Sequence, residues 1–222
     1  MTSDNITVIM KPTNQCNLRC KYCYHADNGY DKEKMTDQVL EKAIAVTAPF
    51  FKRVEYNWHG GEPLIMGLDF YERVLYYQKK YRQGPEHHII NTMQTNGTLI
   101  TQETAEFIKK YGFGIGLSFD GPFNDQTRGK TDYTLNAYDL LKQIDKRHGT
   151  ISVIGAHNIH NLIDIYKYFN EKKTYINILM KKIYHLSFHL CLIQERLKII
   201  ANYYLPILLN MQIKYVNYLI TG

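Results

Sequence analysis

The sequence predicts an α/β protein built on a partial, TIM-like (β/α) barrel with parallel strands. Short β-branched runs alternate with amphipathic segments in five consecutive strand–helix units over residues 1–172. Units of this kind place their strands parallel and join them by right-handed crossovers. Hydrophobic residues make up 45% and charged residues 22% of the 222 positions, as in a folded domain with a substantial core.

The predicted strands are short runs enriched in β-branched and aromatic residues. The first run, ITVIMKPT, opens with three β-branched residues. The others are RVEYNWHG, HHIINTMQ, FGIGLSF and TISVIGAH, and each is followed by a helical pattern. In chain order the predicted strands cover residues 6–13, 53–60, 87–94, 113–119 and 150–157.

The predicted helices are identified by apolar residues at helical spacing and by capping residues. In MTDQVLEKAIAVTAPF, apolar side chains recur at Val39 and Ala43, and Thr36 is placed to cap the first turn. Thr101 begins TQETAEFIKKY, and Gly112 follows it where a C-terminal cap is expected. In chain order the predicted helices cover residues 35–50, 68–81, 101–111, 132–148 and 161–172.

The composition changes near residue 173. No glycine occurs between residues 156 and 221, although the first 155 residues contain thirteen. Residues 173–222 hold six basic residues and one acidic residue, and so carry +5 of the net charge of +6. We therefore expect a core domain over residues 1–172 and an atypical tail, helical or poorly defined, over residues 173–222. One hypothesis for this tail is an out-of-frame or degenerate gene end.

Charge and cysteine usage limit the partners and the compartment. Residues 1–172 have a net charge of only +1, which argues against binding to nucleic acid. Residues 199–220 look apolar but are interrupted by Asn, Gln, Lys and Pro, so we expect no membrane span. The N-terminus lacks a secretory pattern. Three of the four cysteines are clustered, which favours metal binding in a reducing cytoplasm over a disulfide framework.

Segments able to do chemistry follow the first four predicted strands. CNLRCKYC comes after the first strand, HGGEPL ends the second, QTNGTL ends the third and SFDGP ends the fourth. The carboxyl ends of the parallel strands in a barrel meet at one rim, where active sites lie. We therefore expect these four segments to lie close together.

Cys16, Cys20 and Cys23 fall within eight positions. Thiolates are natural ligands of iron–sulfur clusters, and three thiolates on a 4Fe–4S cube leave one iron open to a substrate or cofactor. The alternative is a zinc-binding module in which His25 supplies the fourth ligand.

The spacing Cys-x3-Cys-x2-Cys, with Tyr22 before the last cysteine, resembles the signature of the radical S-adenosylmethionine (SAM) superfamily. The resemblance implies that Cys16, Cys20 and Cys23 hold a 4Fe–4S cluster whose open iron chelates the amino and carboxylate groups of SAM. It further implies that an electron from a reduced flavodoxin- or ferredoxin-type donor cleaves the sulfonium. The product, a 5′-deoxyadenosyl radical, abstracts hydrogen from a substrate.

The segment GGEP resembles the GGE motif of that superfamily. Gly60, Gly61 and Glu62 are accordingly expected to receive the amino group of SAM, and a closely approaching backbone with a carboxylate suits an ammonium group. Arg128 matches an arginine that pairs with the SAM carboxylate, a role that suits the guanidinium fork.

The remaining residues match the superfamily only by their positions in the sequence. Ser118 and Asp120 match positions near the ribose and methionine parts of SAM, and the backbone of Tyr22 is expected near the adenine. Thr95 and Asn96 lie on the same predicted rim. Because each of these two pairs is followed closely by a glycine, a plain turn is the alternative interpretation.

WHGGEPL, QTNGTLI and SFDGP together resemble the anaerobic sulfatase-maturating enzymes and related peptide maturases, over residues 6–172. The resemblance implies an oxidoreductase-type enzyme acting on a peptide or protein, with a sulfatase whose Cys or Ser becomes formylglycine as the candidate substrate. Those enzymes usually add a SPASM domain with two auxiliary clusters, whereas residues 173–222 hold one cysteine. The alternative is therefore a non-catalytic, truncated fragment of such an enzyme.

Overall fold

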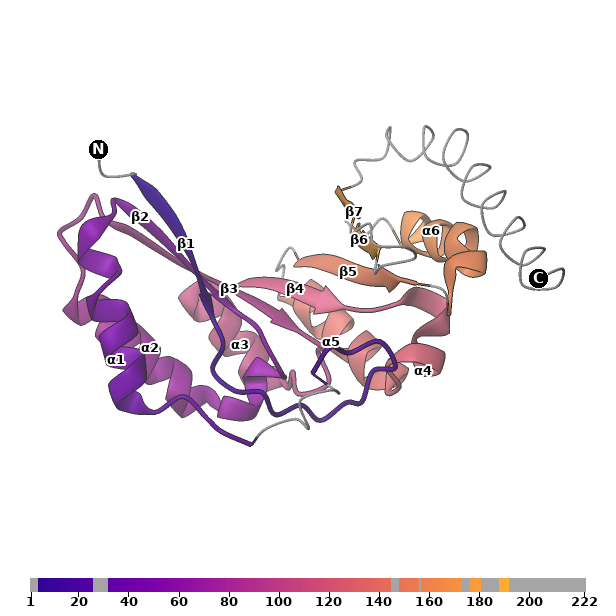
Figure 1. Ribbon diagram of the computed structural model, residues 1–222, viewed down its shortest axis with the longest axis horizontal. Coiled ribbons are helices and arrows are strands. Elements are labelled where there is room, and N and C mark those ends of the chain that lie inside the picture. Colours follow the sequence, from indigo (N-terminus) through magenta and orange to yellow (C-terminus); the bar gives the residue numbers. More distant parts are fainter. Residues whose placement is uncertain are drawn as a thin grey trace, which may run out of the picture. The chain divides into compact units, whose positions relative to one another are not determined.

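The computed structural model describes residues 4–25, 32–144, 148–155 and 157–172, together with the backbone of two short strands further along (Figure 1). The chain divides into two compact units, Met1–Ile151 and Ser152–Gly222. Among the described helices, none is long and apolar enough to cross a membrane. The apolar-looking stretch noted in the sequence lies outside the described residues.

Five parallel strands, in the same order as along the chain, form the sheet of the first unit. The pairing of the last strand with its neighbour covers His148 to Ile151. Parallel pairing brings the carboxyl ends of the strands to one edge, which confirms the predicted fold class. The strands are β1 (Asn5–Met10), β2 (Arg53–Trp58), β3 (His88–Thr95), β4 (Gly114–Ser118) and β5 (His148–Ile154).

Helices connect these strands. They are α1 (Asp37–Ala45), α2 (Leu68–Lys80), α3 (Gln102–Tyr111), α4 (Asn124–Thr127) and α5 (Thr131–Gln143), with short 3-10 turns η2 (Ala48–Phe50), η3 (Pro63–Met66) and η4 (Gly121–Phe123). The Thr36 side chain accepts a hydrogen bond from the Val39 N–H, and the Thr101 side chain accepts one from the Thr104 N–H. Gly112 ends α3 with a φ of 70°. These contacts confirm the three predicted caps.

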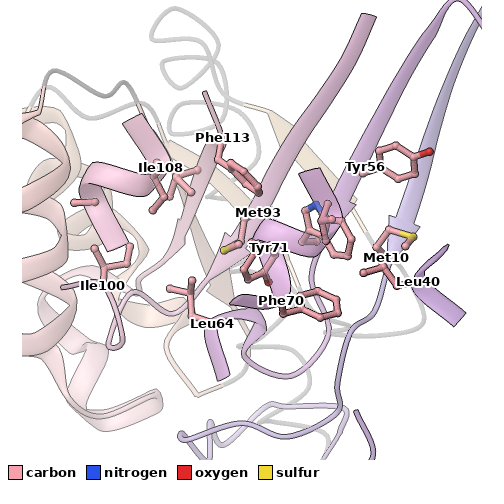
Figure 2. Packing of buried hydrophobic residues seen from close by; sticks show 14 of the residues in the cluster. Met10, Leu40, Tyr56, Leu64, Phe70, Tyr71, Met93, Ile100, Ile108 and Phe113 are labelled. Carbon is pink, nitrogen blue, oxygen red and sulfur yellow. The ribbon is translucent and has the colours of Figure 1, made fainter. Parts of the chain in front are cut away.

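One face of the sheet is buried under α1, α2, α3 and α5 (Figure 1). Side chains alternate along a strand, so Val54, Tyr56 and Trp58 of β2 all enter this layer. Within the core, Tyr71 packs edge-on against Trp58. It also packs edge-on against Phe113 (Figure 2). Each such aromatic pair contributes about 0.5–1.5 kcal/mol beyond the burial of its surface.

Asn91 joins β2, β3 and α2 inside this core. Its side-chain oxygen accepts hydrogen bonds from the Trp58 indole N–H and the Gln78 amide, both at 2.9 Å. Its own amide donates to the Gln78 oxygen at 2.8 Å. All three side chains are buried, and each supplies a partner that the others need. The network therefore fixes how α2 packs on the sheet.

The opposite face of the sheet carries polar and small residues, beside the exposed Ile9 of β1. The Thr92 hydroxyl donates to the Glu55 carboxylate at 3.0 Å, and the Gln94 amide donates to the Ser118 hydroxyl at 2.8 Å. Gly116 makes room for Gln94, because a Cβ at that position would lie 2.1 Å from the Gln94 side-chain oxygen. This half-buried polar face leads to the edge where the strands end.

The structure departs from the predicted elements in several places. The helix predicted over residues 35–50 ends at Ala45, and the 3-10 turn η2 follows it. α5 ends at Gln143 instead of residue 148, because His148 pairs with Ile115 and begins β5. The second unit contains η5 (Ile159–Asn161), α6 (Leu162–Glu171) and two antiparallel strands, β6 (Ile176–Met180) and β7 (Phe188–Cys191). The described part of the tail thus contains strand, and the rest of residues 173–222 lies outside the described residues. The predicted boundary at residue 172 stays a prediction.

Candidate functional site

The segment after β1, residues 11–25, is here named the cysteine loop. Its beginning runs beside the glycine motif that follows β2. The Gly61 N–H donates to the Thr13 carbonyl at 3.0 Å, and the Glu62 N–H donates to the Gln15 carbonyl at 2.7 Å. A side chain at Gly61 would overlap the backbone of the loop. The sequence thus has glycine where two backbone segments touch.

Glu62 is the centre of the first half of the site. One oxygen of its buried carboxylate accepts the Leu64 N–H at 3.0 Å and the Thr95 hydroxyl at 2.7 Å, and the other accepts the Asn96 N–H at 2.8 Å. Burial raises the pKa of Glu62, and these three donors oppose that rise. The structure therefore brings together three of the predicted site residues: Glu62, Thr95 and Asn96.

Replacing Glu62 with glutamine is expected to lower the free energy of unfolding by about 1–3 kcal/mol. An amide offers an acceptor oxygen to only one side of the site. Its NH2 group would face either the Asn96 N–H or the donors from Leu64 and Thr95, and would leave a buried donor unpaired. Urea denaturation measures the change.

Glu41→Gln provides the matched control for this prediction. The Glu41 carboxylate accepts hydrogen bonds from Lys80 and Tyr81 near the surface. Exposed ion pairs contribute little to stability, so this substitution should leave the unfolding transition almost unchanged. Equal losses of unfolding free energy in the two variants would contradict the prediction that the buried hydrogen bonds of Glu62 stabilise the fold more than the surface contacts of Glu41.

Asn96 links this network to the cysteine loop. Its side-chain amide lies 3.8 Å from the Cys16 Sγ and donates to the Asn17 side-chain oxygen at 2.9 Å. The Leu18 N–H donates to the same sulfur at 3.4 Å. Burial raises the pKa of the Cys16 thiol, and the Leu18 N–H opposes that rise. Cys16 thus has N–H donors around its sulfur, which are the outer contacts that support a metal-bound thiolate.

Asp120 and Arg128, beyond the end of β4, form the second half of the site. One oxygen of the fully buried Asp120 carboxylate accepts the hydroxyl groups of Tyr22 and Thr127, both at 2.6 Å. The Arg128 Nε lies 3.4 Å from that oxygen, and its Nη1 lies 3.9 Å from the Cys20 Sγ. Burial raises the pKa of Cys20 to about 11, and Arg128 opposes the rise. Three more predicted site residues therefore meet around Cys20.

Two predicted site residues have other neighbours. The Ser118 hydroxyl accepts from Gln94 on the polar face of the sheet. Gly60, with a φ of 130°, is hydrogen-bonded through its backbone to the buried His25 ring. In the described part of the chain, no three His, Cys, Asp or Glu side chains converge closely enough to hold a single metal ion. The alternative zinc site with His25 as a ligand is therefore not formed in this structure.

The residues present do fit an iron–sulfur cluster. Cys16, Cys20 and Cys23 are free, partly buried and carried by one loop. A 4Fe–4S cube distributes its thiolate ligands over different irons, so the sulfurs need not converge as around one ion. N–H donors lie beside two of the three sulfurs. Such contacts tune iron–sulfur centres.

Several residues that contribute to the site were not predicted from the sequence. Asn17 and Leu18 lie inside the cysteine motif, and Thr127 directly precedes Arg128, so adjacency to a predicted residue was the available signal. Gln94 lies on the polar face because its place in β3 alternates with buried neighbours. The hydroxyl contact of Tyr22 was also not predicted, since only its backbone was expected at the site.

Fold and site together define a class of protein. A parallel α/β sheet carries a three-cysteine loop after its first strand and a glycine–glutamate motif after its second, at one edge. The chain belongs to the radical SAM superfamily, which matches residues 10–169. This finding confirms the resemblance drawn from the cysteine spacing. A 4Fe–4S cluster and SAM are the cofactors characteristic of that superfamily.

Two curated relatives illustrate the similarity. A serine-type anaerobic sulfatase-maturating enzyme of Bacteroides thetaiotaomicron is 36% identical over 180 residues, which are 74% of this chain and 43% of that protein. A cysteine-type anaerobic sulfatase-maturating enzyme of Clostridium perfringens is 31% identical over 182 residues, which are 75% of this chain and 49% of that protein. The chain thus spans about half the length of the curated relatives that it matches.

Solved structures resemble this fold as well. The structure of native anSMEcpe with bound AdoMet and the Kp18Cys peptide has a TM-score of 0.74 and 28% identity, and covers 83% of this chain and 56% of that one. Streptococcus suis SuiB bound to the precursor peptide SuiA has a TM-score of 0.57 and 18% identity, over 78% of this chain and 39% of that one. At that identity the likeness to SuiB concerns the fold alone.

Proposed function

We propose that this chain is the SAM-cleaving part of an enzyme that modifies a peptide or protein substrate. One observation carries the proposal. The sulfurs of Cys16 and Cys20 lie beside the N–H donors of Asn96 and Arg128, at the edge where the glycine motif meets the cysteine loop.

In this proposal Cys16, Cys20 and Cys23 hold the 4Fe–4S cluster. The backbone of Gly60 and Gly61 receives the amino group of SAM. Both oxygens of the Glu62 carboxylate already accept hydrogen bonds from the protein. Glu62 therefore contributes its negative charge near the amino group of SAM without binding it directly. Thr95 and Asn96 act by holding that carboxylate in place.

The remaining residues of the site bind the rest of the cofactor. Arg128 pairs with the SAM carboxylate, Ser118 lies near the ribose, and the backbone of Tyr22 lies near the adenine. Asp120 acts by holding Tyr22 and Arg128. When bound, the cluster and SAM supply radical hydrogen abstraction. A reduced flavodoxin- or ferredoxin-type protein is the proposed electron donor.

The proposed substrate is a peptide or protein of the sulfatase type. Two relatives that exceed 30% identity over about three quarters of this chain are named as sulfatase-maturating enzymes, one serine-type and one cysteine-type. The target would accordingly be a serine or a cysteine whose Cβ hydrogen is abstracted. The polar face of the sheet, which leads to the site, offers hydrogen-bonding groups to such a substrate.

The test is an anaerobic reconstitution of the 222-residue chain with iron and sulfide, followed by chemical reduction and addition of SAM. We expect 5′-deoxyadenosine to form. Adding a sulfatase-derived peptide whose target Cys or Ser is deuterated at Cβ should place deuterium in that product. The control is the same peptide with alanine, also deuterated at Cβ, at the target position. It should transfer no deuterium to 5′-deoxyadenosine.

The outcomes separate the alternatives. A cluster without 5′-deoxyadenosine would favour a non-catalytic fragment. Bound zinc in place of iron and sulfide would favour the metal-binding module. Product formation without deuterium transfer would retain the SAM-cleaving activity and reject the peptide substrate.

A further inference from the structure

Arg128 has a second neighbour besides the place proposed for the SAM carboxylate. Its side chain is 10% exposed, and the guanidinium Nη1 lies 3.9 Å from the Cys20 Sγ. The guanidinium carbon lies 5.3 Å from the centre of the Tyr22 ring, which covers it from one side. The positive charge is thus held against a cysteine ligand before any cofactor is present.

Asp120 fixes this position. Its buried carboxylate lies 3.4 Å from the Arg128 Nε, an ion pair rather than a well-aligned hydrogen bond. The same oxygen accepts hydroxyl groups from Tyr22 and Thr127. The Lys21 N–H also donates to the Thr127 carbonyl at 2.9 Å, so the cysteine loop is tied to this corner at Lys21 as well as at Tyr22.

We infer that Arg128 is a positioning residue that raises the reduction potential of the cluster through Cys20, and that Asp120 sets how strongly it does so. The inference rests on the proposed function. Reduction adds one negative charge to a cluster, and the potential depends on nearby charge and on hydrogen bonds to the sulfurs. A buried cation beside the Cys20 sulfur therefore favours the reduced form, and a buried anion behind that cation opposes it.

Two substitutions should shift the potential in opposite directions. Arg128→Gln removes the cation and should make reduction harder, by about tenfold in the equilibrium constant or about 59 mV for a one-electron couple. Asp120→Asn removes the anion and keeps an oxygen for Tyr22 and Thr127, so reduction should become easier. Arg128→Lys keeps the charge and should shift the potential less than the glutamine variant.

The measurement is a redox titration of the reconstituted full chain without SAM, followed by electron paramagnetic resonance. Arg73→Gln is the matched control, because Arg73 is a surface arginine of α2 that pairs with Asp37. The reduction potential of the cluster in this variant should equal that in the unmodified chain. Omitting SAM separates the two roles of Arg128. If Arg128 served only the SAM carboxylate, replacing it would weaken SAM binding and leave the reduction potential of the SAM-free cluster unchanged.

The results are decisive in each case. Opposite shifts for Arg128→Gln and Asp120→Asn support the inference, and if the glutamine variant binds no cluster, a higher potential in the asparagine variant still supports it. An unchanged potential, or shifts in the same direction, overturns it while leaving the proposed function intact. An unmodified chain that binds no cluster at all would overturn both.

Discussion

Cys20→Ala is expected to abolish both cluster binding and the formation of 5′-deoxyadenosine. The substitution removes one of the three thiolates, and the described part of the loop offers no fourth cysteine to replace it. It also leaves the Arg128 guanidinium without its sulfur neighbour. Iron and sulfide analysis after anaerobic reconstitution, together with the electron paramagnetic resonance signal after reduction, measures the loss.

Cys191→Ala is the matched control for this experiment. Cys191 belongs to β7, far along the chain from the cysteine loop, and it is not among the proposed ligands. The variant should bind the same amount of iron and sulfide as the unmodified chain. Full iron content in the Cys20 variant, or equal losses in both variants, would contradict the assignment of the three ligands.

Gly61→Ala is the second substitution with a large expected effect. A Cβ at this position would lie 2.0 Å from the Gln15 carbonyl oxygen and 2.7 Å from the Asn14 carbonyl. These are backbone atoms of a segment that is held on either side of Asn14, by the hydrogen bonds from Gly61 to Thr13 and from Glu62 to Gln15, so they cannot move aside alone. We expect the free energy of unfolding to fall by about 3 kcal/mol, the upper end for overpacking. Cluster binding should fall with it, because Gln15 directly precedes Cys16.

The control for Gly61→Ala is Gly112→Ala. Gly112 has no atom within 4 Å of an added Cβ, but its φ of 70° is in the left-handed region. That variant should lose about 1–2 kcal/mol through backbone strain alone and should keep its full iron content. Urea denaturation and iron analysis of both chains decide the matter. Normal cluster loading in the Gly61 variant would mean that the loop tolerates the displacement.

Most of the fold could be predicted from local patterns. Strands such as β2 combine β-branched and aromatic residues with clear alternation, and the caps at Thr36 and Thr101 are specified by single side chains. The end of α5 could not be predicted, because the sequence between Gln143 and His148 contains no glycine or proline to stop a helix. Pairing of His148 with Ile115 on the neighbouring strand ended it.

The location of the candidate site at one edge of the sheet could be predicted from the sequence, but its hydrogen bonds could not. Because parallel strands share one carboxyl edge, the cysteine loop, the glycine motif and Asp120 could be assigned to the same rim. The hydrogen bond from Tyr22 to Asp120 could not be found in this way. Its partners lie 98 positions apart, and no local periodicity relates residues at that separation.

The contacts that fix the cysteine loop join residues that the ribosome adds at different times. Cys20 is made early, whereas Arg128, its neighbour in the folded site, is added 108 residues later. At rates of about 5–20 residues per second, the ribosome needs about 5–20 seconds to make the intervening chain. During that interval Arg128 and Asp120 do not yet exist to hold the loop. Cluster insertion should therefore follow the synthesis of Arg128, and a nascent chain that stalls before Asp120 would lack both residues that hold the loop at Tyr22 and Cys20.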